Sequence, residues 1–176
     1  MRVFVIYGTI EGQTRKIARA IAETAQDKGW RATVYDMNDL AEADPAHADR
    51  VIIAAPVHAG DYPREVAEWI KANRLRLKAM PTAFVSVSLS AASQFAEEHE
   101  ALDKITNAFF EETGFAPNAV HQAAGALRYA DYDFLKRLLM RYIARKEGAS
   151  TDTTKNHEFT EWDELARFIA DFLAPA

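Results

Sequence analysis

Short apolar runs alternate with segments of helical periodicity along most of this chain. The runs at residues 3–6 and 51–55 are continuously apolar, as expected for strands that are covered on both faces. Three further strands are predicted at residues 31–35, 81–87 and 119–124. Strands that alternate with helices indicate an α/β domain whose parallel sheet carries helices on both faces.

Apolar residues between these runs recur at the spacing of one helix face. The first helix follows residue 12, and its buried face is expected to contain Ile17, Ala18, Ile21, Ala22 and Ala25. Further helices are predicted to open at Pro63 and to cover residues 93–113, 131–146 and 160–173, with a short or irregular helix at 39–43. In the last helix, Thr160 and Asp163 are expected to form a capping box.

Composition narrows the chemistry that this domain can perform. The chain has no cysteine, which excludes disulfides, thiolate catalysis and cysteine-based metal clusters, so redox chemistry would need a bound organic cofactor. The formal net charge of −5 gives no support to nucleic-acid binding. The five histidines do not have the spacing of metal ligands, so no metal site is predicted. We see no basic-then-apolar leader and no apolar run of ~20 residues, so a cytoplasmic location is expected.

The turn after the first strand has the composition of an anion site. It joins a strand to a helix, so backbone N–H groups and the helix dipole face the same point. Two glycines, Gly8 and Gly12, are expected to let the backbone approach a ligand closely. The hydroxyls of the turn can each donate a hydrogen bond. The residues predicted to bind a cofactor here are Thr9, Ile10, Glu11, Gly12, Gln13 and Thr14.

The spacing of this turn excludes two common nucleotide motifs. It lacks the glycine triplet of GxGxxG, and no lysine follows Gly12 as GxxxxGK[ST] requires. A hydroxyl-rich loop without a cation suits a single terminal phosphate, which is the pattern of the flavodoxin-type FMN loop. An ordinary βα turn, with glycine for tightness and threonine for capping, is the alternative. An anion loop after the first strand, with right-handed crossovers, favours a flavodoxin-like, doubly wound domain with strand order 2-1-3-4-5 over residues 1–176.

Two further loops are expected at the same carboxyl edge of the sheet, where ligands of such folds lie. Their small residues and free backbone groups can bind the polar edge of a flavin ring. The predicted ring-binding residues are Pro56, Val57, His58, Ala59, Gly60 and Tyr62 in one loop and Ser88, Leu89 and Ser90 in the other. His58 is a catalytic candidate because a titratable group beside a flavin could relay protons; a simply solvated loop histidine is the alternative. Tyr62 either packs near the ring or is a surface aromatic that covers the next helix.

The segment after the fifth strand is a candidate substrate rim. It combines glycine, a cation and an aromatic at a strand end, and the residues predicted to bind substrate are Gly125, Leu127, Arg128 and Tyr129. Arg128 is the second catalytic candidate, because its guanidinium could pair with an acidic substrate group. A surface loop with an incidental arginine is the alternative.

The predicted helix after this rim is strongly basic. Residues 134–146 contain no acidic residue and five basic ones: Lys136, Arg137, Arg141, Arg145 and Lys146. A basic amphipathic helix indicates a membrane-surface contact or a protein-docking face, and each basic residue near an anionic leaflet contributes roughly 1 kcal/mol. A core helix with a solvated basic face is the alternative.

Four stretches of the chain resemble the bacterial menaquinone-dependent protoporphyrinogen IX dehydrogenases, a family of flavodoxin-like FMN proteins. They are the phosphate turn at 12–18, the fourth strand and its loop at 80–89, the segment at 124–129, and the tail at 151–155 with 160–162. The resemblance implies FMN as cofactor, a porphyrinogen-like substrate and a quinone acceptor. It also implies peripheral attachment to the cytoplasmic face of the inner membrane.

The sequence leaves other functions of the same fold open. Residues 94–114 carry six acidic residues against Lys104 alone, which suits the partner-binding face of a flavodoxin-type electron carrier with no small-molecule substrate. An NAD(P)H:quinone reductase is the third possibility, although no separate nicotinamide motif is visible. A homo-oligomer is also compatible with the sequence.

Overall fold

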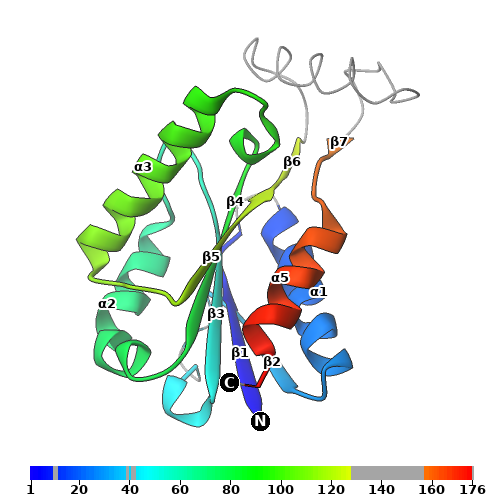
Figure 1. The fold of residues 1–176 in the computed structure, drawn as a ribbon. Helices are drawn as coiled ribbons and strands as arrows, with labels where there is room; N and C mark the ends of the chain where they lie inside the picture. Colours follow the sequence, from blue (N-terminus) through cyan, green and yellow to red (C-terminus); the bar gives the residue numbers. More distant parts are fainter. Residues whose placement is uncertain (10–11, 39, 41–42, 128–156, 176) are drawn as a thin grey trace.

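The computed structural model describes residues 1–9, 12–38, 40, 43–127 and 157–175. Its centre is a 5-stranded sheet in the order β2-β1-β3-β4-β5, which confirms the predicted order (Figure 1). All neighbouring strands in this sheet are parallel. The strands are β1 (Arg2–Tyr7), β2 (Arg31–Asp36), β3 (Arg50–Pro56), β4 (Thr82–Ser88) and β5 (Ala119–Ala124).

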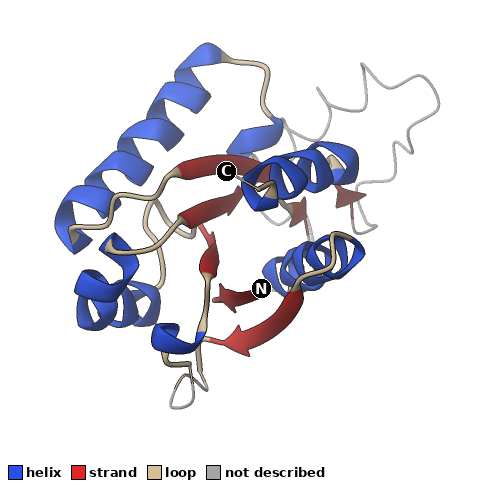
Figure 2. Ribbon diagram, turned by 60° about the horizontal axis from the view of Figure 1, so that its bottom comes forward, coloured by secondary structure: helices blue, strands red, loops and turns tan. Residues whose placement is uncertain are grey.

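Helices cover both faces of the sheet, as predicted (Figure 2). One face carries α1 (Gln13–Asp27) and α5 (Trp162–Leu173), and the other carries α2 (Arg64–Lys78) and α3 (Ala96–Thr113). Short 3-10 turns at Pro45–His47 and Ser90–Ala92 precede β3 and α3. The carboxyl ends of the strands lie at the top of Figure 1, and both chain termini lie at the opposite end.

Successive side chains of each strand point to opposite faces of the sheet, so the core has two layers. The predicted apolar face of α1 is buried throughout, at 0–6% exposure, against alternate residues of β1 and β3 on one side of the sheet. On the other side, Phe84 lies at the centre of an aromatic cluster with Phe109, Phe110 and Phe115. Each fully buried large apolar side chain contributes about 1.5–3 kcal/mol, so both layers hold the central strands rigidly in place.

Several predicted element boundaries differ from the structure. The helix after β4 begins at Ala96 rather than residue 93, because residues 90–92 form a 3-10 turn first. Pro63 is the residue before α2, at its N-cap, rather than the first residue inside it. The predicted helix at 131–146 lies outside the described residues, as does most of the predicted short helix at 39–43.

The predicted capping box of the last helix is wrong. No side chain caps α5, which begins at Trp162, two residues later than predicted. The Thr160 hydroxyl instead donates to the carbonyl oxygen of Ala124 at 2.7 Å. The Thr160 hydroxyl, which the sequence pattern assigned to the N-terminus of the helix, therefore donates to a backbone carbonyl at the end of β5.

A second, 2-stranded sheet lies beyond the carboxyl end of β5. It pairs β6 (Ala126–Leu127) with β7 (His157–Glu158) in the antiparallel sense. These strands were not predicted, because two-residue strands carry no periodicity of their own and their partners lie about thirty residues apart in the sequence. The pairing holds the connection to α5 beside the end of the main sheet (Figure 1).

The turn between β3 and α2 is a tight hairpin. His58 and Asp61 exchange both backbone hydrogen bonds, at 2.9 and 3.1 Å. The two residues between them have positive φ angles, 52° for Ala59 and 84° for Gly60, as a type I′ turn requires. Among the described residues other than glycine, Ala59 alone has a positive φ angle. This conformation is sterically unfavourable for an L-residue with a Cβ.

On the outer strand β5, one histidine is packed against α5. The ring of His121 stacks on Phe168, with centroids 5.0 Å apart and planes 24° apart. Burial lowers the pKa of His121 below its usual value, although the charge of Glu164 opposes the shift. The folded chain therefore favours neutral His121.

No helix of the described residues is both long enough and apolar enough to span a bilayer.

Replacing Ala59 by asparagine should stabilise the fold by about 0.5–1 kcal/mol, because asparagine tolerates left-handed φ angles better than alanine. Replacing Ala59 by valine should destabilise it by at least as much, because a β-branched side chain is strained there. Urea denaturation of the three proteins measures both effects. Equal stabilities of the two variants would contradict a strained Ala59.

The free energy of unfolding should fall as the pH drops below about 6.5, because unfolded His121 then binds a proton that the folded chain excludes. His121→Phe keeps the stacking on Phe168 and removes this titration, so its stability should depend less on pH between 6.5 and 5. Exposed His47→Gln serves as the control and should keep the wild-type slope. Identical slopes for wild type and His121→Phe in urea denaturation would refute the assignment.

Candidate functional site

The predicted phosphate turn connects β1 to the first turn of α1. Gly8 continues the strand pairing by donating its N–H to the Ala54 carbonyl at 3.1 Å. Further along, the Thr9 hydroxyl accepts the N–H of Gly12 at 2.8 Å. Gly12 has φ 89° and is the N-cap residue of α1. Ile10 and Glu11 lie outside the described residues, so their predicted contacts stay predictions.

Glycine is required at positions 8 and 12 of the turn for different physical reasons. A Cβ on Gly8 would lie 3.2 Å from Cγ2 of Val66, so this glycine allows β1 to pack closely against α2. Packing against α2 is therefore a structural reason for Gly8, and its expected role in the approach of a ligand stays a prediction. Gly12 does meet a conformational requirement, because its left-handed φ is rarely adopted by residues with a Cβ.

The first turn of α1 is open to an anion. Gln13 and Thr14 begin the helix, where backbone N–H groups have no intrahelical acceptor. The described first turn contains no acidic residue and no side-chain cap that would compete for these groups. The helix dipole adds a partial positive charge at the same point. Neutral donors, a left-handed glycine and an uncapped helix start fit a phosphate monoester.

The nearest arginine on this helix is held away from the turn. Arg15 donates from Nε to the Tyr7 hydroxyl at 3.2 Å and lies 3.7 Å from the Asp36 carboxylate. The Tyr7 hydroxyl donates in turn to Asp36 at 2.8 Å. Burial and the hydrogen bond to Asp36 raise the pKa of Tyr7, so this hydroxyl stays protonated. The Arg15 guanidinium is thus paired with residues at the ends of β1 and β2. This agrees with a phosphate site that consists of neutral donors.

Asp36 is the acceptor at the centre of this cluster. Burial raises the pKa of its carboxyl, but hydrogen bonds from Asn38 and Tyr7 and the charge of Arg15 outweigh burial, so the pKa is lower than usual. A cavity of about 470 Å³ beside the cluster is lined by Tyr7, Arg15, Arg19, Val34, Tyr35 and Asp36. It lies at the β2 side of the turn, and none of the described residues of the three predicted cofactor loops lines it.

The loop after β3 lies next to the phosphate turn, because β1 and β3 are neighbours in the sheet. Val57 donates its N–H to Val87 at 2.8 Å, which joins this loop to the end of β4. The hairpin of His58 to Asp61 follows, with His58, Ala59 and Gly60 exposed to solvent. Its two central N–H groups make no hydrogen bond to the described residues and can serve as donors to a ligand.

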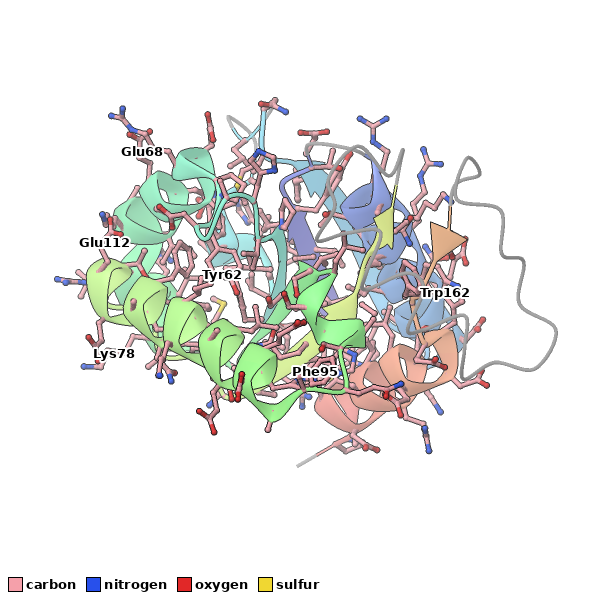
Figure 3. All side chains as sticks on the ribbon, turned by 90° about the horizontal axis from the view of Figure 1, so that it is seen from above. Tyr62, Glu68, Lys78, Phe95, Glu112 and Trp162 are labelled. Atoms are coloured by element: carbon pink, nitrogen blue, oxygen red, sulfur yellow. The ribbon has the colours of Figure 1, made fainter. Side chains whose placement is uncertain are left out.

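Tyr62 anchors this loop from inside the protein. Its side chain is only 5% exposed, and its hydroxyl lies 2.8 Å from the hydroxyls of both Ser86 and Thr106. Burial raises its pKa, although both hydrogen bonds oppose the shift. Its ring contacts Phe84 and Phe109 between α2 and α3 (Figure 3). The alternative of a surface aromatic is therefore wrong. The ring is buried in the core, and its packing near a flavin ring stays a prediction.

The loop after β4 completes the carboxyl edge. The Ser88 hydroxyl accepts the N–H of Ala91 at 3.1 Å, which stabilises the short 3-10 turn. The Ser88 carbonyl accepts the N–H of Gly125 at 3.0 Å. Leu89 and Ser90 are half-buried at the start of this turn. The structure therefore brings the loops at 56–62 and 88–90 together with the phosphate turn, as the strand order predicts.

Part of the predicted substrate rim lies at this edge as well. Gly125 is buried against Ser88, and a Cβ at its position would lie 3.6 Å from Cγ1 of Val87. Leu127 belongs to β6, immediately beyond the sheet. Arg128, Tyr129 and the basic segment at 134–146 lie outside the described residues, and their roles stay predictions.

Sequence reasoning missed one polar contact of the site. The side-chain amide of Gln13 donates to the Thr160 hydroxyl at 2.9 Å, across 147 residues of sequence. The amide therefore faces the connection between β7 and α5. The only sequence signal was the polar character of both residues, which does not identify a partner.

Comparison with known proteins places this geometry in a family. The flavodoxin domain model matches residues 4–154. A protoporphyrinogen IX dehydrogenase (quinone) of Escherichia coli (strain K12) is 31% identical over 97% of this chain and 94% of its own length. The protein of the same name from Leishmania major is 31% identical over 98% of this chain and 75% of its own length.

Solved structures show the same fold. A short-chain flavodoxin associated with a non-canonical PDU bacterial microcompartment superposes with a TM-score of 0.52, at 14% identity, over 81% of this chain and 94% of that one. A flavodoxin from Streptococcus pneumoniae TIGR4 gives a TM-score of 0.51, at 17% identity, over 97% of this chain and 99% of that one. With its 2-1-3-4-5 sheet and a matching model over most of its length, the chain belongs to the flavodoxin domain family.

Proposed function

We propose that this protein is an FMN-dependent oxidoreductase that removes hydrogen from protoporphyrinogen IX and passes the electrons to a quinone, in haem biosynthesis. Membership of the flavodoxin family implies a bound flavin. The name shared by the two relatives, which match nearly the whole chain, supports the substrate and the acceptor. The observation that carries the proposal is the uncapped first turn of α1 beside the two loops at 56–62 and 88–90.

The phosphate turn favours FMN over a larger or more highly charged nucleotide. Its donors would be the backbone N–H groups of Gln13 and Thr14 and the neutral hydroxyl of Thr14, and the nearest arginine of α1 is paired with Asp36. A terminal phosphate monoester can be held by such donors at a helix N-terminus without a lysine or a metal ion. A triphosphate would need further cations to offset its charge.

The flavin, when bound, supplies the two-electron chemistry that the side chains of this chain cannot perform. The chain positions it: the free N–H groups of Ala59 and Gly60 would bind the polar edge of the ring. Exposed His58 would exchange protons with solvent near that edge. Arg128 would pair with a propionate of the substrate. Tyr62 keeps the ring-side loop in place through its buried hydroxyl contacts.

We also propose that the enzyme works at the cytoplasmic face of the inner membrane, where a membrane quinone is accessible. Support comes from the sequence of residues 134–146, whose five basic residues would be attracted to an anionic leaflet.

A second candidate function is that of an electron carrier without a small-molecule substrate. Helix α3 supports it, because its exposed face carries Glu97, Glu100, Asp103, Glu111 and Glu112. Of these carboxylates, Glu112 is paired with Lys71 at 2.6 Å, and the others make no ion pair with the described residues. Such a face would steer the protein toward a basic partner. A turnover assay separates the two functions.

Replacing Gly12 by alanine should lower the affinity for FMN about tenfold or more, because the left-handed φ of 89° would be lost or strained. Gly29→Ala is the matched control: it lies at the other end of α1, has φ 80° and has no atom within 4 Å of the added Cβ. Both variants should lose about 1 kcal/mol of stability, but only Gly12→Ala should lose flavin affinity. Fluorescence titration with FMN decides, and equal affinities would contradict the assignment of the turn.

The purified protein should be yellow, and it should oxidise protoporphyrinogen IX with menaquinone as acceptor in a steady-state assay. Arg128→Gln should raise KM several-fold while changing kcat less, because binding of the propionate is lost before the redox step is affected. Arg64→Gln, which removes an exposed pair with Glu68, should leave both constants unchanged. A flavin-loaded protein that accepts electrons from a reductase but shows no turnover would establish the carrier instead.

A further inference from the structure

The connection between β7 and α5 is attached to the phosphate turn by partly buried polar contacts. Thr160 lies in this connection and is half-buried. Its hydroxyl donates to the Ala124 carbonyl at 2.7 Å and accepts the Gln13 side-chain amide at 2.9 Å. Gln13 is only 9% exposed, so water competes little for these bonds. One hydroxyl thus joins the start of α1 to the end of β5.

The chemistry of the three groups fixes the direction of each bond. A carbonyl oxygen only accepts, so the single proton of the Thr160 hydroxyl is used on Ala124. The hydroxyl oxygen can then only accept from Gln13. The nitrogen of the Gln13 amide, and not its oxygen, must therefore face Thr160. A side chain in the first turn of α1 is held in one orientation by a residue near the other end of the chain.

A second contact reinforces the first on the outer side. Lys16 pairs with Glu158 at 2.9 Å, and the other carboxylate oxygen of Glu158 accepts the Trp162 indole N–H at 2.9 Å. Trp162 lies on the side of the molecule that carries β7 and α5 (Figure 3). Because Lys16 is 59% exposed, this ion pair is screened and contributes less than the partly buried contact of Gln13 with Thr160. Both contacts attach residues 158–162 to the first turn of α1.

The two residues that Thr160 joins, Gln13 and Ala124, lie next to two different parts of the proposed site. Gln13 directly follows Gly12, the left-handed residue of the phosphate turn. Ala124 directly precedes Gly125, whose N–H is bound to the loop at 88–90. The bonds therefore connect the phosphate side of the site to the side where the substrate rim begins. Movement of β5 relative to α1 would break them.

We propose that Thr160 is a positioning residue for the flavin phosphate: through Gln13 it holds the first turn of α1 in the geometry that binds the phosphate. This inference rests on the proposed function of the turn as an FMN phosphate site. It assigns to the α5 connection a part in cofactor selectivity, since only a ligand with a terminal phosphate uses the first-turn donors. Riboflavin, which has the same ring and no phosphate, does not depend on them.

The test compares FMN with riboflavin in Thr160→Val, which has nearly the same shape and can neither donate nor accept a hydrogen bond. The affinity for FMN should fall about tenfold, and that for riboflavin should change less than twofold. Thr160→Ser should restore the wild-type ratio of the two affinities. Thr113→Val is the matched control, because Thr113 is 2% exposed and its hydroxyl also donates to a carbonyl, that of Phe109, but in α3. It should lower stability and leave the ratio unchanged.

Equal losses of FMN and riboflavin affinity in Thr160→Val, or the same ratio change in Thr113→Val, would overturn the proposal. A double-mutant cycle with Gln13→Ala provides a measurement that needs no flavin. The effects of the two substitutions on urea denaturation should be non-additive, and additive effects would overturn the bonded chain itself. Wild-type protein that binds neither flavin would instead refute the proposed function, while the cycle would still decide whether Thr160 positions Gln13.

Discussion

Burial of the central sheet on both faces is the constraint on which the rest of this structure depends. The three middle strands have almost no exposed side chain, because α1 and α5 cover one face and α2 and α3 cover the other. The polar groups that a ligand can reach therefore lie at the ends of the strands. In a parallel sheet all carboxyl ends lie at one edge, so the loops with glycine, serine, threonine and histidine meet there.

The loops at this edge are held by polar contacts that reach into the core or across the fold. Tyr62 is bound beneath its loop by hydroxyls of β4 and α3, and Ser88 binds both its own turn and Gly125. Such contacts keep the backbone donors of the loops in place without using them. The donors of the hairpin and of the first turn of α1 are left for a ligand, which is the arrangement that electrostatic pre-organisation requires.

The basic side chains near the phosphate turn are likewise paired with other residues. Arg15 is satisfied by Tyr7 and Asp36 at the ends of β1 and β2, and Lys16 by Glu158 beyond the main sheet. The turn itself keeps neutral donors and a helix dipole. Neutral donors at a helix N-terminus suit a singly esterified phosphate and would leave a polyphosphate undercompensated.

The alternation of apolar runs and helical periodicity was enough to predict the sheet order, the faces of α1 and the three loops at the carboxyl edge. These are consequences of local pattern and of rules that hold for parallel sheets in general. The positive φ of Gly12 was not predicted, because the sequence assigned this glycine, like Gly8, to the close approach of a ligand. The exposure predicted for Tyr62 in one of its two interpretations and the capping role of Thr160 were wrong.

The differences at Tyr62 and Thr160 and the packing of Gly8 have the same cause, which is a partner far away in the sequence. Gly8 is small because Val66 of α2 lies against it, and Tyr62 is buried because Ser86 and Thr106 offer its hydroxyl two partners. Thr160 does not cap α5, because its hydroxyl donates to the carbonyl of Ala124 instead. The sequence by itself determined which elements form and where polar groups can gather, since both depend on periodicity. Only the tertiary structure decided which polar group meets which, because a hydrogen bond depends on distances that no local pattern encodes.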